Sequence, residues 1–106
     1  MEIMTPYYKL EGHIPIAVDF EEWAAWRTTA NTQVILSVIH SFISVSTVFT
    51  GINIGTVEQP KIFESLVTGG SCDREKRFYS TWDEAISGHY DLIIQSIAMT
   101  PYPLIV

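Results

Sequence analysis

The segment from Thr28 to Val57 contains no Asp, Glu, Lys or Arg, and this constrains the fold more than any other feature of the chain. A membrane-spanning helix needs about 20 mostly apolar residues. Here Ser and Thr are interspersed throughout, and β-branched residues, which favour strands, are abundant. Residues 42–50 alternate with a period of two, and Gln33–Ile39 is almost continuously apolar. The segment therefore predicts two buried strands rather than a spanning helix.

Two other segments carry the signals of helices. Asp19, with Glu22 three residues later, predicts an N-terminal cap and a helix over about 19–30. Thr81 begins a second capping-box pattern, and apolar residues recur after it at spacings of three and four. This pattern predicts a helix from residue 82 to about 97.

The remaining segments are short. They predict a hairpin over 7–16 with its turn at Glu11-Gly12, strands at Lys61–Val67 and Arg77–Ser80, and an extended apolar tail over 98–106. Strands joined in series by short loops pair in an antiparallel manner. We therefore expect an α+β fold: a two-layer sandwich with a mainly antiparallel sheet of about four to six strands and two helices packed on one face. A length of 106 residues fits a single domain over 1–106.

Charge and cysteine content narrow the partners and the compartment. The formal net charge is −6, and the only basic cluster, Arg74, Lys76 and Arg77, is interrupted by Glu75. Binding to nucleic acid needs clustered cations, so no direct nucleic-acid contact is expected. The first residues lack the basic start and apolar run of a secretory signal, which predicts a cytoplasmic protein with a reduced Cys72. We expect no membrane contact, no metal and no cofactor.

Four segments together resemble a family of small, uncharacterised proteins encoded by phages and prophages. They are YYKLEG at 7–12, SVSTVFTGIN at 44–53, PKIFESLVTGG at 60–70 and FYSTWDEAISGH at 78–89. The resemblance implies a phage context in the cytoplasm of a bacterial host, and it assigns no reaction. Family members commonly have an aspartate where Asn53 stands, so this chain keeps the shape of that side chain and loses its charge.

The candidate site residues fall into two sets. His89 lies on the apolar stripe of the second helix, Glu64 lies on a neighbouring strand, and Cys72 lies in a glycine-rich loop beside basic residues. These three residues form a candidate catalytic or ligand site. Apolar side chains that the predicted core does not use form a candidate contact surface, which comprises Trp26, Tyr102, Leu104, Ile105 and Val106.

Three functions remain open from the residues. The first is an acidic phage-derived protein that binds a host or phage protein and inhibits or modulates a host enzyme or defence system. The second is a small enzyme or ligand-binding domain with its site near Glu64, Cys72 and His89. The third is a structural homodimer formed through the C-terminal tail. The sequence contains no recognisable catalytic motif, which favours the first.

Overall fold

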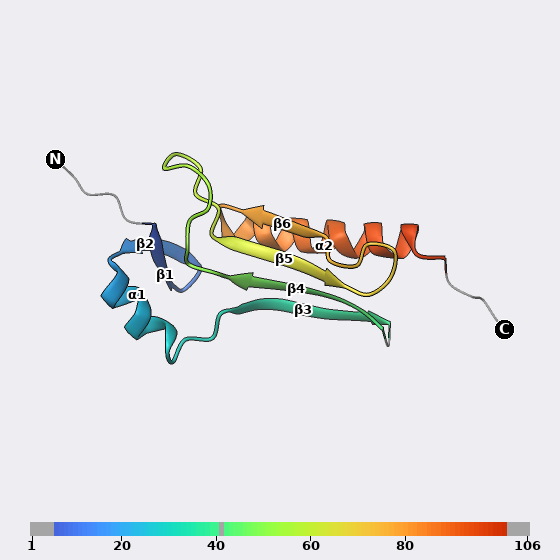
Figure 1. The fold of residues 1–106 in the computed structure, drawn as a ribbon, viewed down its shortest axis with the longest axis horizontal. Helices are drawn as coiled ribbons and strands as arrows, with labels where there is room; N and C mark the ends of the chain where they lie inside the picture. The colour runs from blue at the N-terminus through green and yellow to red at the C-terminus, as the bar shows by residue number, and fades with distance from the viewer. Residues whose placement is uncertain (1–5, 41, 102–106) are drawn as a thin grey trace.

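A computed structural model describes residues 6–40 and 42–101 of the chain. Its elements follow one another as two strands, a helix, four strands and a helix (Figure 1). In chain order they are β1 (Tyr7–Glu11), β2 (Ile14–Val18), α1 (Phe20–Arg27), β3 (Gln33–His40), β4 (Ile43–Phe49), β5 (Phe63–Thr68), β6 (Lys76–Tyr79) and α2 (Trp82–Met99). The expected α+β class with antiparallel strands is confirmed.

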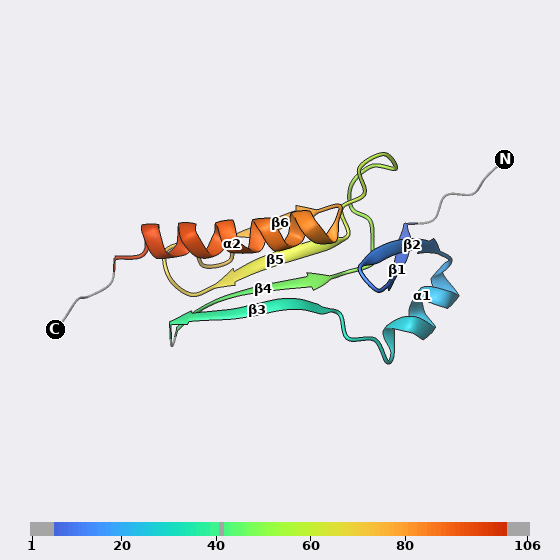
Figure 2. The same cartoon turned by 180° about the vertical axis from the view of Figure 1, so that it is seen from behind.

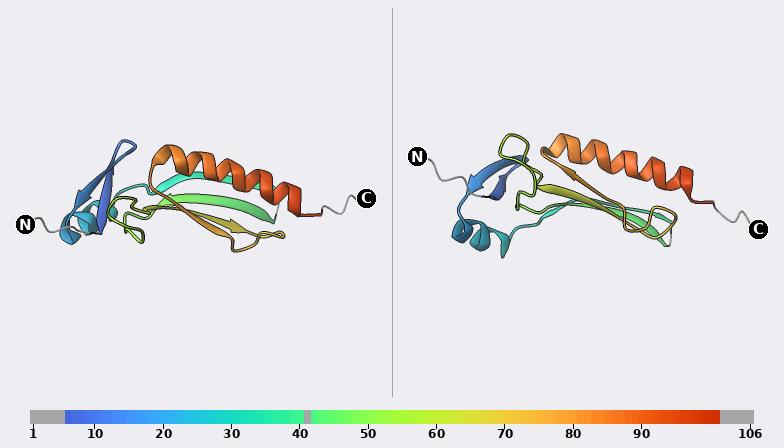
Figure 3. Two further views of the ribbon diagram at one scale, coloured as in Figure 1. Left: turned by 90° about the horizontal axis from the view of Figure 1, so that it is seen from above. Right: turned by 45° about the horizontal axis from the view of Figure 1, so that its top comes forward.

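The strands form two separate sheets. β1 and β2 make a hairpin, and β3, β4, β5 and β6 make a four-stranded antiparallel sheet in which chain order is also spatial order. α2 lies along one face of the larger sheet, and no helix of the described residues lies on the opposite face (Figures 2 and 3). The hairpin and α1 lie together at one end of this layered part (Figure 1).

The alternation in the sequence decides which side chains face α2. In β4 the buried residues are Ile43, Val45, Thr47 and Phe49, and the residues between them are only partly buried. β5 follows the same pattern, because Phe63, Ser65 and Val67 are buried. Cross-strand pairing keeps these rows in register, with Phe49 opposite Phe63 and Thr47 opposite Ser65. One face of the sheet is therefore packed and the other is open.

Aromatic side chains connect α1 to the larger sheet. Trp26 packs edge-on against Phe49 with ring centroids 5.7 Å apart, Phe49 against Phe63 at 5.0 Å, and Phe63 against Trp82 at 6.3 Å. α1 packs mainly on β1 of the hairpin, where Tyr7 contacts Trp23 at 5.2 Å. Both helices were expected to pack on one sheet. α1 reaches the packed side of the larger sheet only at its end, through Trp26.

Both helices are capped as their sequences predict, but their ends differ from expectation. α1 ends at Arg27 because the threonines that follow are poor helix formers, and Thr28 Oγ1 instead donates to the carbonyl of Ala25. α2 continues to Met99, since Ala98 and Met99 favour helix and Pro101 is the first residue to oppose it. The described residues include no helix long and apolar enough to cross a membrane.

Gly88 provides a test of how closely α2 packs on the sheet. A Cβ at Gly88 would overlap the ring of Tyr79 on β6. We expect Gly88→Ala to lower the free energy of unfolding by about 1–3 kcal/mol through overpacking, although alanine is the better helix former. Urea unfolding measures this effect. Ser87→Ala, at the exposed neighbouring position, serves as the control, and equal destabilisation in the two variants would contradict the packing.

Candidate functional site

A row of polar side chains lies buried between α2 and the sheet. His89 of α2 is fully buried, its Nδ1 lies 2.7 Å from Thr47 Oγ1, and its Nε2 lies 2.9 Å from Ser37 Oγ. Thr47 Oγ1 in turn bonds the hydroxyl of Ser65. The row therefore joins the helix to β3, β4 and β5. It arises because His89 shares a helical stripe with Ala85, and that stripe faces the sheet.

The surroundings of His89 favour the neutral imidazole. Burial lowers the pKa of the imidazole, because a charged ring is poorly solvated there. A neutral ring offers one donor and one acceptor, and the two hydroxyls that it faces satisfy both. The ring thus fixes the position of α2 over β3 and β4. Burial also raises the pKa of the Tyr79 phenol, which keeps that neighbouring group uncharged.

The other two residues of the predicted catalytic set lie elsewhere. Cys72 is buried in a cluster with Val45, Val67 and Leu92, so it is a packing residue and not a thiol on an open loop. Glu64 alternates with the buried residues of β5 and therefore lies on the open face, where its carboxylate is 3.7 Å from the ammonium group of Lys76. The sheet separates Glu64 from His89, so these groups do not converge on one substrate.

The predicted contact surface is described only in part. Trp26 is half-buried, because its ring packs against Phe49, and its remaining surface lines a cavity with His13 and Trp82. Tyr102, Leu104, Ile105 and Val106 lie outside the described residues. The contribution of the tail to a contact surface therefore stays a prediction.

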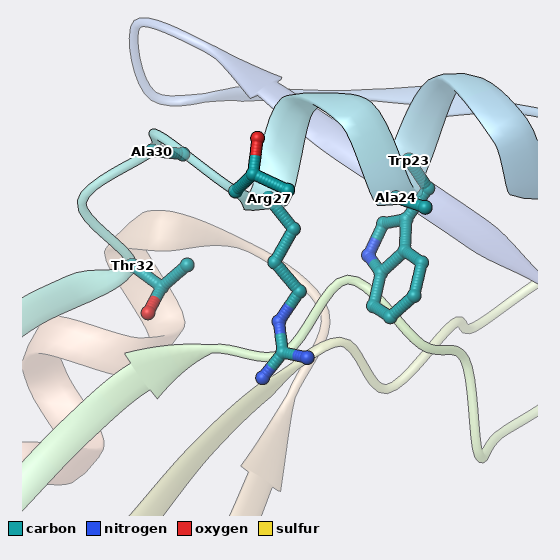
Figure 4. A pocket seen from close by; sticks show the side chains of 6 residues that line it. Trp23, Ala24, Arg27, Ala30 and Thr32 are labelled. Atoms are coloured by element: carbon teal, nitrogen blue, oxygen red, sulfur yellow. The ribbon is translucent and has the colours of Figure 1, made fainter.

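Two hollows lie beside α1. One, of about 400 Å³, is lined by Trp23, Arg27 and Thr32 among others (Figure 4). It lies at the carbonyl end of α1, which favours cations over anions, and Arg27 is already placed 5.3 Å above the ring of Trp23. The second, of about 480 Å³, lies between Trp26 and Trp82, and there His13 stacks on Trp82 at 3.7 Å.

Asn53 organises the loop between β4 and β5. Its Oδ1 accepts hydrogen bonds from the backbone N–H groups of Gly55 and Lys61 at 2.7 and 2.8 Å. Its Nδ2 donates to the carbonyl of Thr56 at 3.0 Å. An aspartate could keep the two accepted bonds, but it could not donate the third. The Asn53 side chain therefore has a structural role in this loop.

The open face of the larger sheet carries a mixed set of side chains, which we call the outer face. Its apolar members are Leu36, Val38, Val48, Leu66 and Phe78, and its polar members are Ser44, Ser46, Glu64, Thr68 and Lys76. Within it Leu36, Ser46, Leu66 and Lys76 form one cross-strand row. Large exposed apolar side chains that lie together in this way commonly mark a contact surface.

The two edges of the sheet differ in how they are protected. β6 has four residues, and it is flanked by a closed set of polar contacts in which Arg77 bonds Glu75 and Gln95, and Gln95 bonds Glu75. β3 has eight residues and no charged side chain or proline. Charges, prolines and short length are the usual protection of an edge strand against pairing. Of the two described edges, β6 has the charges and the short length, whereas β3 has a bulge near each end, which is a further protection and leaves Ile35–Val38 as its regular stretch.

α2 carries a second apolar stripe on the side of β3, which we call the α2 stripe. Its members are Ile86, Tyr90, Ile93 and Ile97, spaced four, three and four residues apart. Ile93 packs with Ile39 of β3 against the same buried cluster. On the other side of the helix, Gln95 faces β6. The spacings of three and four in the sequence predict one apolar stripe on this helix, and the structure shows a second one beside it.

Comparison of the chain with protein-family models, with curated proteins and with solved structures found no match.

The buried ring of His89 predicts how stability depends on pH. Its pKa in the folded chain lies below the value near 6.5 of the unfolded chain, so the unfolded chain binds more protons between these two values. The free energy of unfolding should therefore fall as the pH drops through about 6.5. Urea unfolding at pH 7.5 and pH 5.5 measures this loss.

His89→Gln identifies the source of that dependence. Glutamine keeps a donor and an acceptor but does not titrate, so the variant should lose much of the decrease between pH 7.5 and 5.5. It should also be less stable at pH 7.5 by about 1–3 kcal/mol, because the buried bonds are not reproduced in full. His13→Gln, at an exposed position, should retain the decrease. An equal decrease in wild type and His89→Gln would contradict the assignment.

Proposed function

We propose that this chain acts by binding another protein through the outer face of its four-stranded sheet. The observation that carries the proposal is the exposed apolar set on that face, in which Leu36, Val38 and Phe78 are each more than one-third exposed. Folding leaves these side chains without a covering layer among the described elements (Figure 3). A partner that covered them would remove apolar area from water, which favours association.

The sequence adds the class of partner. The resemblance to phage and prophage proteins supports a host or phage protein as the partner, met in the bacterial cytoplasm. The net charge of −6 favours a partner with a basic rim, because complementary charge speeds association and suppresses wrong partners. In this proposal the chain inhibits or modulates a host enzyme or a defence complex by contact, and it performs no chemistry of its own.

Phe78→Lys tests this function. Phe78 lies directly opposite Glu64, so a lysine there faces a carboxylate, and we expect the fold to be kept. Wild-type protein should recover a stoichiometric partner from a lysate of its bacterial host, and Phe78→Lys should recover at least tenfold less. The readout is the amount of partner retained per mole of immobilised chain.

Ile54→Lys is the matched control, because it also replaces a large exposed apolar residue with lysine, but in the β4–β5 loop and away from the outer face. It should recover the partner as wild type does. Recovery of no stoichiometric partner by wild type, or equal recovery by Phe78→Lys, would overturn the proposal.

A further inference from the structure

The β3 edge and the α2 stripe lie on the same side of the molecule, because Ile93 of the stripe packs with Ile39 of β3. β3 is the edge strand of the sheet, with no described strand on its outer side (Figure 1). In the α2 stripe on that side, Tyr90 and Ile97 are exposed although they are large and apolar. Residues 28–57, which include β3, carry no charge. An unpaired strand edge next to exposed apolar side chains is a surface suited to another strand.

The charge distribution indicates which chain supplies the strand that pairs with β3. A chain of net charge −6 repels its own copies wherever their acidic surfaces meet. Along β3, two copies can pair without opposing like charges, and in the α2 row the acidic side chain is Asp83, which lies one turn before Ile86 near the start of the helix. β3 of one copy can pair with β3 of a second copy that runs in the opposite direction. This is the self-complementary contact that a two-fold dimer requires. We propose that the chain forms a homodimer in which β3 pairs with β3 of a second copy in an antiparallel manner.

The bulges of β3 limit the register of this pairing. They lie at Gln33/Ile35 and at Val38/His40, so the regular stretch between them is Ile35–Val38. Pairing centred there places Leu36 and Val38 of one copy beside Val38 and Leu36 of the other. The two α2 stripes then face each other across the joined strands. The outer faces become continuous over eight strands, and Phe78 on β6 stays away from the contact.

Mass in solution gives the first readout. Light scattering coupled to size exclusion should give the wild-type chain twice its mass of 12.0 kDa. The double variant L36K/V38K should have a dimer dissociation constant raised by at least tenfold, because lysines of the two copies would lie side by side in the paired strands. Both residues are exposed, Val38 by 69%, so the isolated fold should tolerate the lysines. Circular dichroism and thermal unfolding check this.

A charge exchange makes the test independent of folding losses. The variant L36E/V38E should also be monomeric, since its glutamates repel in the same way. An equimolar mixture of L36K/V38K and L36E/V38E should recover the dimeric mass, because each lysine then meets a glutamate. This recovery is expected only if the two β3 strands lie next to each other.

Two controls separate this contact from others. Ile14→Lys changes an equally exposed apolar residue of the hairpin and should leave the dimeric mass unchanged. A chain that ends at Pro101 should also stay dimeric, whereas a tail-mediated dimer would dissociate. A monomeric wild type, a dimeric L36K/V38K, a monomeric chain ending at Pro101, or folded variants that fail to associate on mixing would each overturn the proposal. Loss of partner binding in Phe78→Lys bears only on the proposed function, since Phe78 is not part of this contact.

Discussion

Edge-to-face packing of Phe49 against Phe63 is the contact on which the arrangement of the other elements depends. The two rings lie at the end of the sheet nearest the hairpin, and Trp26 and Trp82 extend the row to the two helices. Pairs of this kind contribute about 0.5–1.5 kcal/mol beyond the area that they bury. The backbone adds to this attachment, because the N–H of Tyr8 donates to the carbonyl of Gly51 at 2.8 Å and the N–H of Asn53 donates to the carbonyl of Pro6 at 2.7 Å.

A second constraint acts along α2 and is polar. His89 meets hydroxyls from two strands, so sliding the helix along the sheet would leave a buried nitrogen without a partner. An unsatisfied buried polar group costs roughly 1–3 kcal/mol. Apolar packing between α2 and the sheet is tolerant of small shifts, whereas these directed bonds are not. The polar row therefore gives the helix one position, and that position leaves the α2 stripe over β3.

The predicted site residues show where sequence reasoning reaches its limit. His89 was placed correctly on the stripe of α2 that faces the sheet, because helical spacing determines that face. Glu64 and Cys72 were grouped with it by proximity in the expected fold, and the structure separates them: strand alternation places Glu64 on the outer face, and loop packing buries Cys72. Proximity of elements does not decide which face a side chain takes, and a shift of one residue along a strand reverses it.

The sequence alone determined the class of the fold, the two capped helices and the alternation of β4, since these depend on local hydrogen bonds and on the periods of helix and strand. It also showed that residues 28–57 carry no charge. Only the tertiary structure decided that the strands divide into two sheets, that β3 and β6 are the two edges of the larger sheet, and that α2 covers a single face of it. These properties depend on contacts between residues far apart in the chain, and no local pattern specifies which strand is left unpaired.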